Sequence, residues 1–102
     1  MKNAEIIAKL NLEQKCALLS GAGTFTTRGC PKAGVPSITL SDGPNGVRKQ
    51  AGAADHLGLN PSVPATCFPT AGTVANSWDP ALAEEMGEAL GSEAHDLDVN
   101  VL

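Results

Sequence analysis

Residues 35–46 have the sequence VPSITLSDGPNG, which joins a short apolar alternation to a dense turn signal. Ile38 and Leu40 alternate with polar side chains, as expected of a short strand with one buried face. The run 42–46, Asp-Gly-Pro-Asn-Gly, is typical of a tight turn. We therefore predict a strand that ends in a polar turn, the place where α/β proteins assemble their sites.

Two short helices are predicted before this strand. The first covers residues 3–10, with Asn3 as its cap, and the second begins at Asn11. Gln14 follows Asn11 by three residues, which is close to a capping box. In the second helix one face is expected to be apolar, with Leu18 beside it: Leu12, Cys16 and Leu19.

The region after the strand is irregular at first and then helical. Residues 49–64 form a long segment rich in Gly, Ala and Pro, and 63–69 favours a second extended piece. Residues 70–77 favour a helical turn or two. The clearest helix follows Asp79, a capping residue, with Pro80 at the first helical position. Its apolar stripe consists of Leu82, Met86, Leu90, Ala94 and Leu97.

The last residues, 99–102 (VNVL), predict the opening of a buried strand. Such a strand needs neighbours on both sides, and this chain supplies few, so we expect a truncated chain. The order helix, strand, long loop, helix, strand then predicts an α/β protein whose larger part lies outside these residues.

Length and charge exclude several classes. The 102 residues are too few for a complete (β/α)8 barrel, which typically needs about 250. A net charge of -4 argues against nucleic acid and anionic membranes as partners. No apolar run approaches the roughly 20 residues of a membrane span, and the first residues lack the apolar stretch of a secretory signal. We expect a cytoplasmic protein.

Cysteine usage argues against a metal or disulfide scaffold. The three cysteines are an odd number without a close CxxC pair, and the two histidines are isolated from them in sequence. We predict no metal site and no cofactor.

Asp42 and Arg48 are the candidate functional residues. A carboxylate at Asp42 can accept hydrogen bonds from the hydroxyl groups of a polyol such as a sugar, or it can simply cap the turn. The Arg48 guanidinium can bind a carboxylate or a ligand oxygen, or remain a solvated surface charge. The glycines between them allow the chain to fold back and bring the two residues together.

Other polar and aromatic residues have simpler interpretations. Trp78 is interpreted as a core ring or a ring at the helix entry. Four glutamates of the last helix are interpreted as a solvated face rather than as acid/base machinery: Glu84, Glu85, Glu88 and Glu93.

Several blocks, in order along nearly the whole chain, resemble glycoside hydrolase family 3, and most closely its bacterial β-glucosidase-like members. These blocks are LEQK (12–15) with LLSG (18–21), GVPSI (34–38), LSDGPNGVR (40–48), PATCFP (64–69), ANSWD (75–79) with Leu82, Gly87 and Glu93-Ala94, and DVNVL (98–102).

The resemblance implies an α/β fold, with residues 1–102 as the incomplete N-terminal portion of a (β/α)8-like (TIM) barrel domain. It implies a retaining, exo-acting β-glucosidase that releases terminal β-D-glucosyl residues. The family's nucleophile and acid/base come later in its chains, so we expect no catalytic residue here and no activity of residues 1–102 alone. By match to the family's motif, Asp42 and Arg48 bind the terminal sugar.

The partners implied are a β-glucoside or short oligosaccharide and the missing C-terminal part of the same chain. Two alternatives stay open. One is a β-xylosidase of the same family. The other is a non-catalytic carbohydrate-binding or interaction module.

Overall fold

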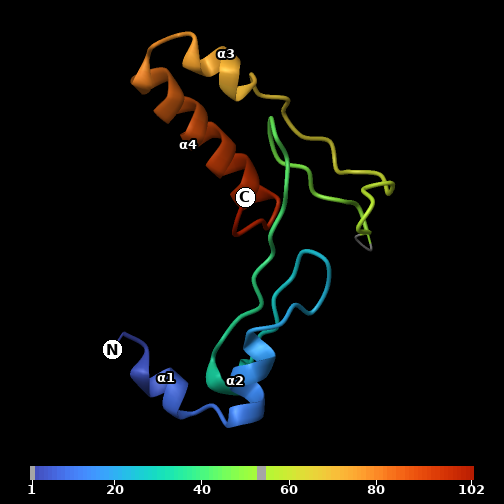
Figure 1. The fold of residues 1–102 in the computed structure, drawn as a ribbon, viewed down its shortest axis with the longest axis vertical. Coiled ribbons are helices and arrows are strands. Elements are labelled where there is room, and N and C mark those ends of the chain that lie inside the picture. The colour runs from blue at the N-terminus through green and yellow to red at the C-terminus, as the bar shows by residue number, and fades with distance from the viewer. Residues whose placement is uncertain (1, 53–54) are drawn as a thin grey trace. The chain divides into compact units, whose positions relative to one another are not determined.

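The computed structural model of the chain describes residues 2–52 and 55–102. The chain divides into two compact units, Met1–Thr39 and Leu40–Leu102 (Figure 1). Part of the long irregular segment predicted over 49–64, residues 53 and 54, lies outside the described residues.

The first unit carries α1 (Ala4–Ala8), α2 (Leu12–Leu18) and the 3-10 turn η1 (Pro31–Ala33). The predicted capping box of α2 is confirmed. The Asn11 side chain accepts from the Gln14 backbone N–H at 2.8 Å, and the Gln14 side chain accepts from the Asn11 N–H at 2.9 Å. At α1 the helix is confirmed but the cap is wrong. Asn3 is in the left-handed region with φ 70°, and its side chain makes no capping hydrogen bond.

The core of this unit lies between the end of α1 and η1. Leu10, Cys30 and Ala33 are buried, and Leu18 and Val35 pack against them. The apolar face predicted for α2 is wrong in all three of its members. Cys16 is exposed, and Leu12 and Leu19 are 77% and 90% exposed. Leu18, predicted to lie beside that face, packs against the core instead.

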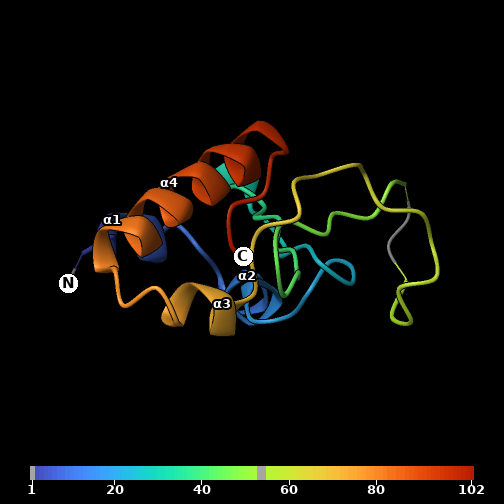
Figure 2. The same cartoon turned by 90° about the horizontal axis from the view of Figure 1, so that it is seen from above.

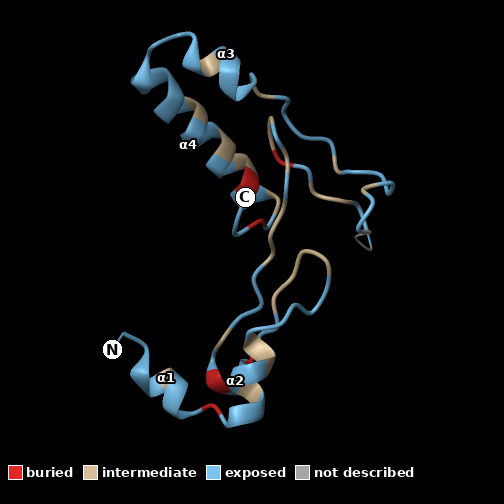
Figure 3. Ribbon diagram, viewed as in Figure 1, coloured by how far each residue is buried: buried red, intermediate tan, exposed pale blue. Residues whose placement is uncertain are grey.

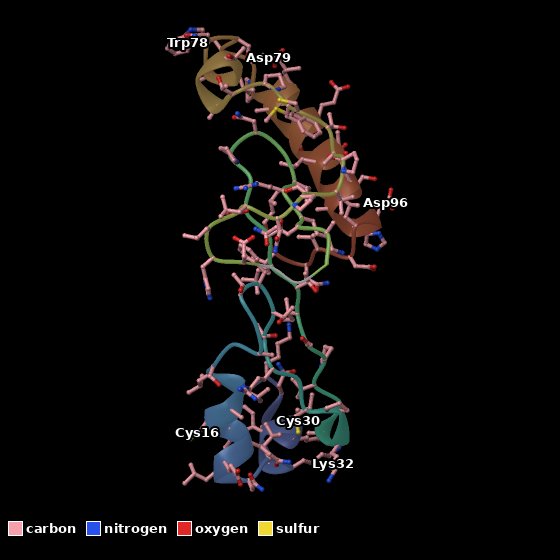
Figure 4. The ribbon with its side chains drawn as sticks, turned by 90° about the vertical axis from the view of Figure 1, so that its right-hand side faces the viewer. Cys16, Cys30, Lys32, Trp78, Asp79 and Asp96 are labelled. Carbon is pink, nitrogen blue, oxygen red and sulfur yellow. The ribbon has the colours of Figure 1, made fainter. Side chains whose placement is uncertain are left out.

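The second unit carries α3 (Ala71–Ala75) and α4 (Pro80–Asp96), which a short connection joins (Figures 1 and 2). Both predicted helices are confirmed. Asp79 caps α4, because its Oδ1 accepts from the backbone N–H groups of Ala81 at 2.9 Å and Leu82 at 3.3 Å. The core interpretation of Trp78 is wrong. It lies beside Asp79 at the entrance of α4, 90% exposed (Figure 4).

Strand pairing in the described residues consists of isolated bridges only. In the second unit they join Leu40 to Val101 in parallel, Asp42 to Arg48 antiparallel and Gln50 to Ser62 antiparallel. The strands predicted over 35–41 and 99–102 are therefore joined by a single bridge, beside which the Ser41 N–H donates to the Val101 carbonyl at 2.9 Å. Val35 and Thr39 form two further isolated bridges, with Cys30 and Thr26. A longer ladder requires further neighbouring strands on either side, as the parallel sheets of α/β proteins have.

The core of the second unit lies at the C-terminal end of α4. Val47, Ala94 and Val99 are buried there, with Leu90 and Leu97 packed against them (Figure 3). Three of the five residues of the predicted apolar stripe of α4, namely Leu90, Ala94 and Leu97, thus belong to the cluster that contains Val47. Among the described residues, no helix has both the length and the apolar character needed to cross a membrane.

Candidate functional site

The polar turn brings Asp42 and Arg48 together, as their spacing allows. The two residues form an antiparallel bridge, and the Arg48 N–H donates to the Asp42 carbonyl at 2.9 Å. Gly43 makes this reversal possible. Its φ is 149°, and a Cβ there would overlap the carbonyl oxygen of Gly46. The turn thus places two chemically complementary side chains at neighbouring positions.

The side chains of the two candidate residues, Asp42 and Arg48, do not pair with each other. The Asp42 side chain is exposed and takes no hydrogen bond from the described residues, so it does not cap the turn. Arg48 is exposed as well, but its Nη2 donates to the Gly58 carbonyl at 2.7 Å. In the described part of the chain, no salt bridge joins Asp42 to Arg48. The Asp42 carboxylate therefore remains available to hydroxyl donors.

A compact loop holds the Arg48 side chain. The Asp55 carboxylate accepts from the N–H groups of Leu57, Leu59 and Asn60 at 2.7, 3.1 and 2.8 Å. These hydrogen bonds hold the pKa of the Asp55 carboxyl below its ordinary value of 3.8, and the bond from Asn60 has the largest effect. Gly58 lies inside this loop. Asp55 therefore shapes the loop that offers Arg48 its acceptor.

A second segment, residues 64–69, borders the turn. The Phe68 N–H donates to the Asn45 carbonyl at 2.8 Å, and a Cβ on Gly46 would overlap the Thr66 carbonyl oxygen. Thr66 is in turn bound to Glu93 of α4. Between the turn and this segment lies a depression of about 260 Å³, lined by residues 43–48, 63 and 65–67.

The interpretation of Glu93 as part of a solvated face is wrong. Its Oε1 accepts from the backbone N–H of Thr66 at 2.8 Å and from the Thr66 hydroxyl at 2.9 Å. A signal for this was present in the sequence. Glu93 lies three residues after Leu90 and four before Leu97, on the apolar stripe itself. A carboxylate at such a position needs a polar partner.

Two other features lie apart from Asp42 and Arg48. An apolar groove of about 310 Å³ runs between α3 and α4, lined by Pro69, Thr73, Val74, Leu82, Glu85, Met86 and Ala89. Cys16 and Cys67 are exposed free thiols and Cys30 is buried. Within residues 2–52 and 55–102, no three metal-binding side chains gather in one place.

Comparison with known proteins shows that this chain is similar to parts of several glycosidases. No family model matches it. It is 45% identical over 98 residues, 96% of its length, to thermostable β-glucosidase B of Acetivibrio thermocellus. It is 42% identical over 88 residues, 85% of its length, to an exo-α-(1→6)-L-arabinopyranosidase of Bifidobacterium longum. The chain spans only 13% and 12% of the lengths of these two relatives.

Two solved β-glucosidase structures are similar to this chain in fold. β-Glucosidase 3B from Thermotoga neapolitana, in complex with glucose, matches 100% of this chain with a TM-score of 0.81 and 29% identity. A family 3 glycoside hydrolase, the β-glucosidase of Bifidobacterium adolescentis, matches 93% of it with a TM-score of 0.77 and 34% identity. This chain corresponds to 16% and 13% of those two chains.

Proposed function

We propose that this chain is the N-terminal part of a glycoside hydrolase family 3 enzyme, and that the full-length protein is a retaining, exo-acting β-glucosidase that releases terminal β-D-glucosyl residues. The observation that carries this proposal is the 45% identity to a β-glucosidase over 96% of the chain. A relative of known structure that binds glucose supports a sugar substrate.

Residues 1–102 are proposed to form the first units of a (β/α)8-like barrel. The parallel bridge between Leu40 and Val101 supports this assignment, because neighbouring strands of such a barrel run parallel. α3 and α4 lie between these two residues in the chain and supply the crossover connection. Asp42 then follows the first strand at its carboxyl end, where barrel enzymes bind their substrates.

Asp42 and Arg48 are proposed to bind the terminal sugar. The Asp42 carboxylate has its acceptor positions free for sugar hydroxyls, and hydrogen bonds to an ionised acceptor are roughly twice as strong as neutral ones. Arg48 lies at the neighbouring position, and its guanidinium has further N–H groups besides the one that Gly58 accepts. These contacts are made on the side of the sugar that is remote from the bond that is cleaved.

Their contribution to the reaction is orientation. Retention requires two carboxyl groups about 5–5.5 Å apart, one as nucleophile and one as acid/base. We assign both to the remainder of the full-length protein. A sugar fixed by Asp42 and Arg48 presents its anomeric carbon to the nucleophile in a constant geometry, which lowers the entropic part of the barrel enzyme's activation free energy.

A second candidate function is the hydrolysis of terminal pentopyranosides. The 42% identity to an exo-α-(1→6)-L-arabinopyranosidase favours it. A pentopyranose lacks the hydroxymethyl group of glucose, so the two functions differ in the pocket around that group. The two functions are separated by measuring kcat/KM of the full-length protein for three aryl glycosides: the β-D-glucoside, the β-D-xyloside and the α-L-arabinopyranoside. We expect the glucoside to be preferred, and preference for either pentopyranoside overturns the glucosidase assignment.

The sugar-binding role is tested by Asp42→Ala in the full-length protein. Loss of two hydrogen bonds to a charged acceptor, at about 1.5–3 kcal/mol each, corresponds to a fall in kcat/KM of roughly 100-fold or more. Asp96→Ala is the matched control, because Asp96 is also an exposed aspartate of the second unit. An Asp42→Ala enzyme within twofold of the control refutes the role.

A further inference from the structure

Hydrogen bonds to Glu93 connect the irregular segment 64–69 to α4. Its Oε1 takes both donors of Thr66, at 2.8 Å from the backbone nitrogen and 2.9 Å from the hydroxyl. Its other oxygen, Oε2, is buried and has no hydrogen-bond partner in the described part of the chain. Two hydrogen bonds to one ionised oxygen make this a strong contact between parts of the chain 27 residues apart.

Thr66 needs this contact because its segment has no regular structure. Residues 64–70 belong to no helix and to no strand bridge in the described chain. A backbone of this kind is positioned by individual hydrogen bonds rather than by a ladder. The contact with Glu93 therefore fixes where the Thr66 carbonyl lies.

The Thr66 carbonyl lies directly against the apex of the polar turn. A Cβ on Gly46 would overlap its oxygen, so the two backbones touch. Two residues later, the Phe68 N–H donates to the Asn45 carbonyl at 2.8 Å. Any movement of Thr66 is thus passed to Asn45 and Gly46, which lie between Asp42 and Arg48.

α4 contacts the same turn by a second route. Ala94, which follows Glu93, is buried together with Val47 and Val99. The C-terminal end of α4 therefore contacts the polar turn in two ways. Ala94 packs with Val47 of the turn, and Glu93 holds the neighbouring segment through Thr66.

We propose that Glu93 is a positioning residue for the sugar site, acting through Thr66 and Gly46 on Asp42 and Arg48. It contacts no sugar itself. This inference rests on the proposed function, because it takes the sugar-binding role of Asp42 and Arg48 as its premise.

The test measures glucose binding to the full-length protein, as the inhibition constant of glucose in the hydrolysis of an aryl β-glucoside. Glu93→Ala is expected to weaken glucose binding by roughly 10- to 100-fold, because displacements of about 1 Å at a site have effects of this size. Glu93→Gln keeps an acceptor for both Thr66 donors and is expected to have a smaller effect, as is Thr66→Val, which keeps the backbone donor. Glu88→Ala, at an exposed glutamate of the same helix, is expected to match the wild type.

A double variant separates positioning from general stabilisation. Because Glu93 acts through Asp42 as well as Arg48, Glu93→Ala is expected to weaken glucose binding by a smaller factor in the Asp42→Ala background than in the wild type, since effects along one path are not additive. Hydrogen exchange of the peptide containing Thr66 is expected to accelerate in Glu93→Ala and not in Glu88→Ala.

Three results overturn the inference. The first is an equal loss of affinity from Glu93→Ala in the wild-type and Asp42→Ala backgrounds, which indicates a purely structural role. The second is wild-type affinity in Thr66→Val, which loses one of the two hydrogen bonds to Glu93 and keeps the inference testable if Glu93→Ala does not fold. The third is wild-type affinity in Asp42→Ala, which removes the proposed function and this inference with it. If Asp42→Ala strongly weakens glucose binding and Glu93→Ala does not, the positioning role of Glu93 is refuted while the proposed function stands.

Discussion

Replacement of Gly46 by alanine is expected to displace the backbone of the turn and so to weaken the proposed sugar site. Gly46 has φ 137°, a conformation that residues with a Cβ rarely adopt, and its added methyl group would overlap the Thr66 carbonyl oxygen. The backbone conformation alone costs about 1–3 kcal/mol in a non-glycine residue. Relief of the overlap displaces Thr66 and weakens its two hydrogen bonds to Glu93, at about 1 kcal/mol each. The sum is about 3–5 kcal/mol of destabilisation.

Thermal unfolding and glucose inhibition of the full-length protein measure this effect. With about 2–4 °C per kcal/mol for a large domain, Gly46→Ala is expected to lower the Tm by at least about 6 °C. Glucose binding is expected to weaken by more than tenfold. Gly91→Ala is the control, because a Cβ on this glycine of α4 meets nothing within 4 Å, and it is expected to be neutral or to stabilise by up to about 1 kcal/mol. If Gly46→Ala matches Gly91→Ala in both Tm and affinity, the argument for a backbone contact beneath the turn is wrong.

Three further outcomes are expected. Val47→Ala removes two buried methyl groups and lowers the free energy of unfolding by about 2 kcal/mol, measured in urea, whereas a change below about 0.5 kcal/mol contradicts the core assignment. Asp79→Ala removes the cap of α4 and costs about 1 kcal/mol, while Asp79→Ser retains most of the stability, and equal effects of the two exclude capping. Because the folded-state pKa of Asp55 is lowered, its contribution to the loop is complete above pH 3.8 and is lost as the pH falls through the folded value. Hydrogen exchange of residues 55–60, corrected for intrinsic rates, is expected to accelerate at low pH in the wild type and to be fast throughout in Asp55→Asn.

Local signals predicted the helices of this chain well. The Asn11 and Gln14 capping box and the Asp79-Pro80 start of α4 depend on groups within four residues of each other, so sequence alone determines them. The turn between Asp42 and Arg48 was predictable for the same reason. Its glycines permit the reversal that the structure shows.

Features that depend on distant partners were not predictable in this way. The place of Glu93 on the apolar stripe indicates that its carboxylate needs a polar partner, but the sequence does not show that this partner is Thr66, 27 residues earlier. Leu19 and Trp78 are apolar, yet their exposure depends on which segments pack beside them. The strand predicted at residues 35–41 shows the same dependence, because a strand pairs only as far as its neighbours extend.

The central claim is that the turn of Asp42 and Arg48 holds the terminal sugar of a β-glucosidase. A crystal structure of the full-length protein with bound glucose tests it most directly. The account predicts sugar hydroxyl oxygens about 2.5–2.7 Å from the Asp42 carboxylate, the range for hydrogen bonds to an ionised acceptor, with the Arg48 guanidinium beside the same sugar. Glucose bound in the catalytic centre without contact to either side chain would contradict the claim.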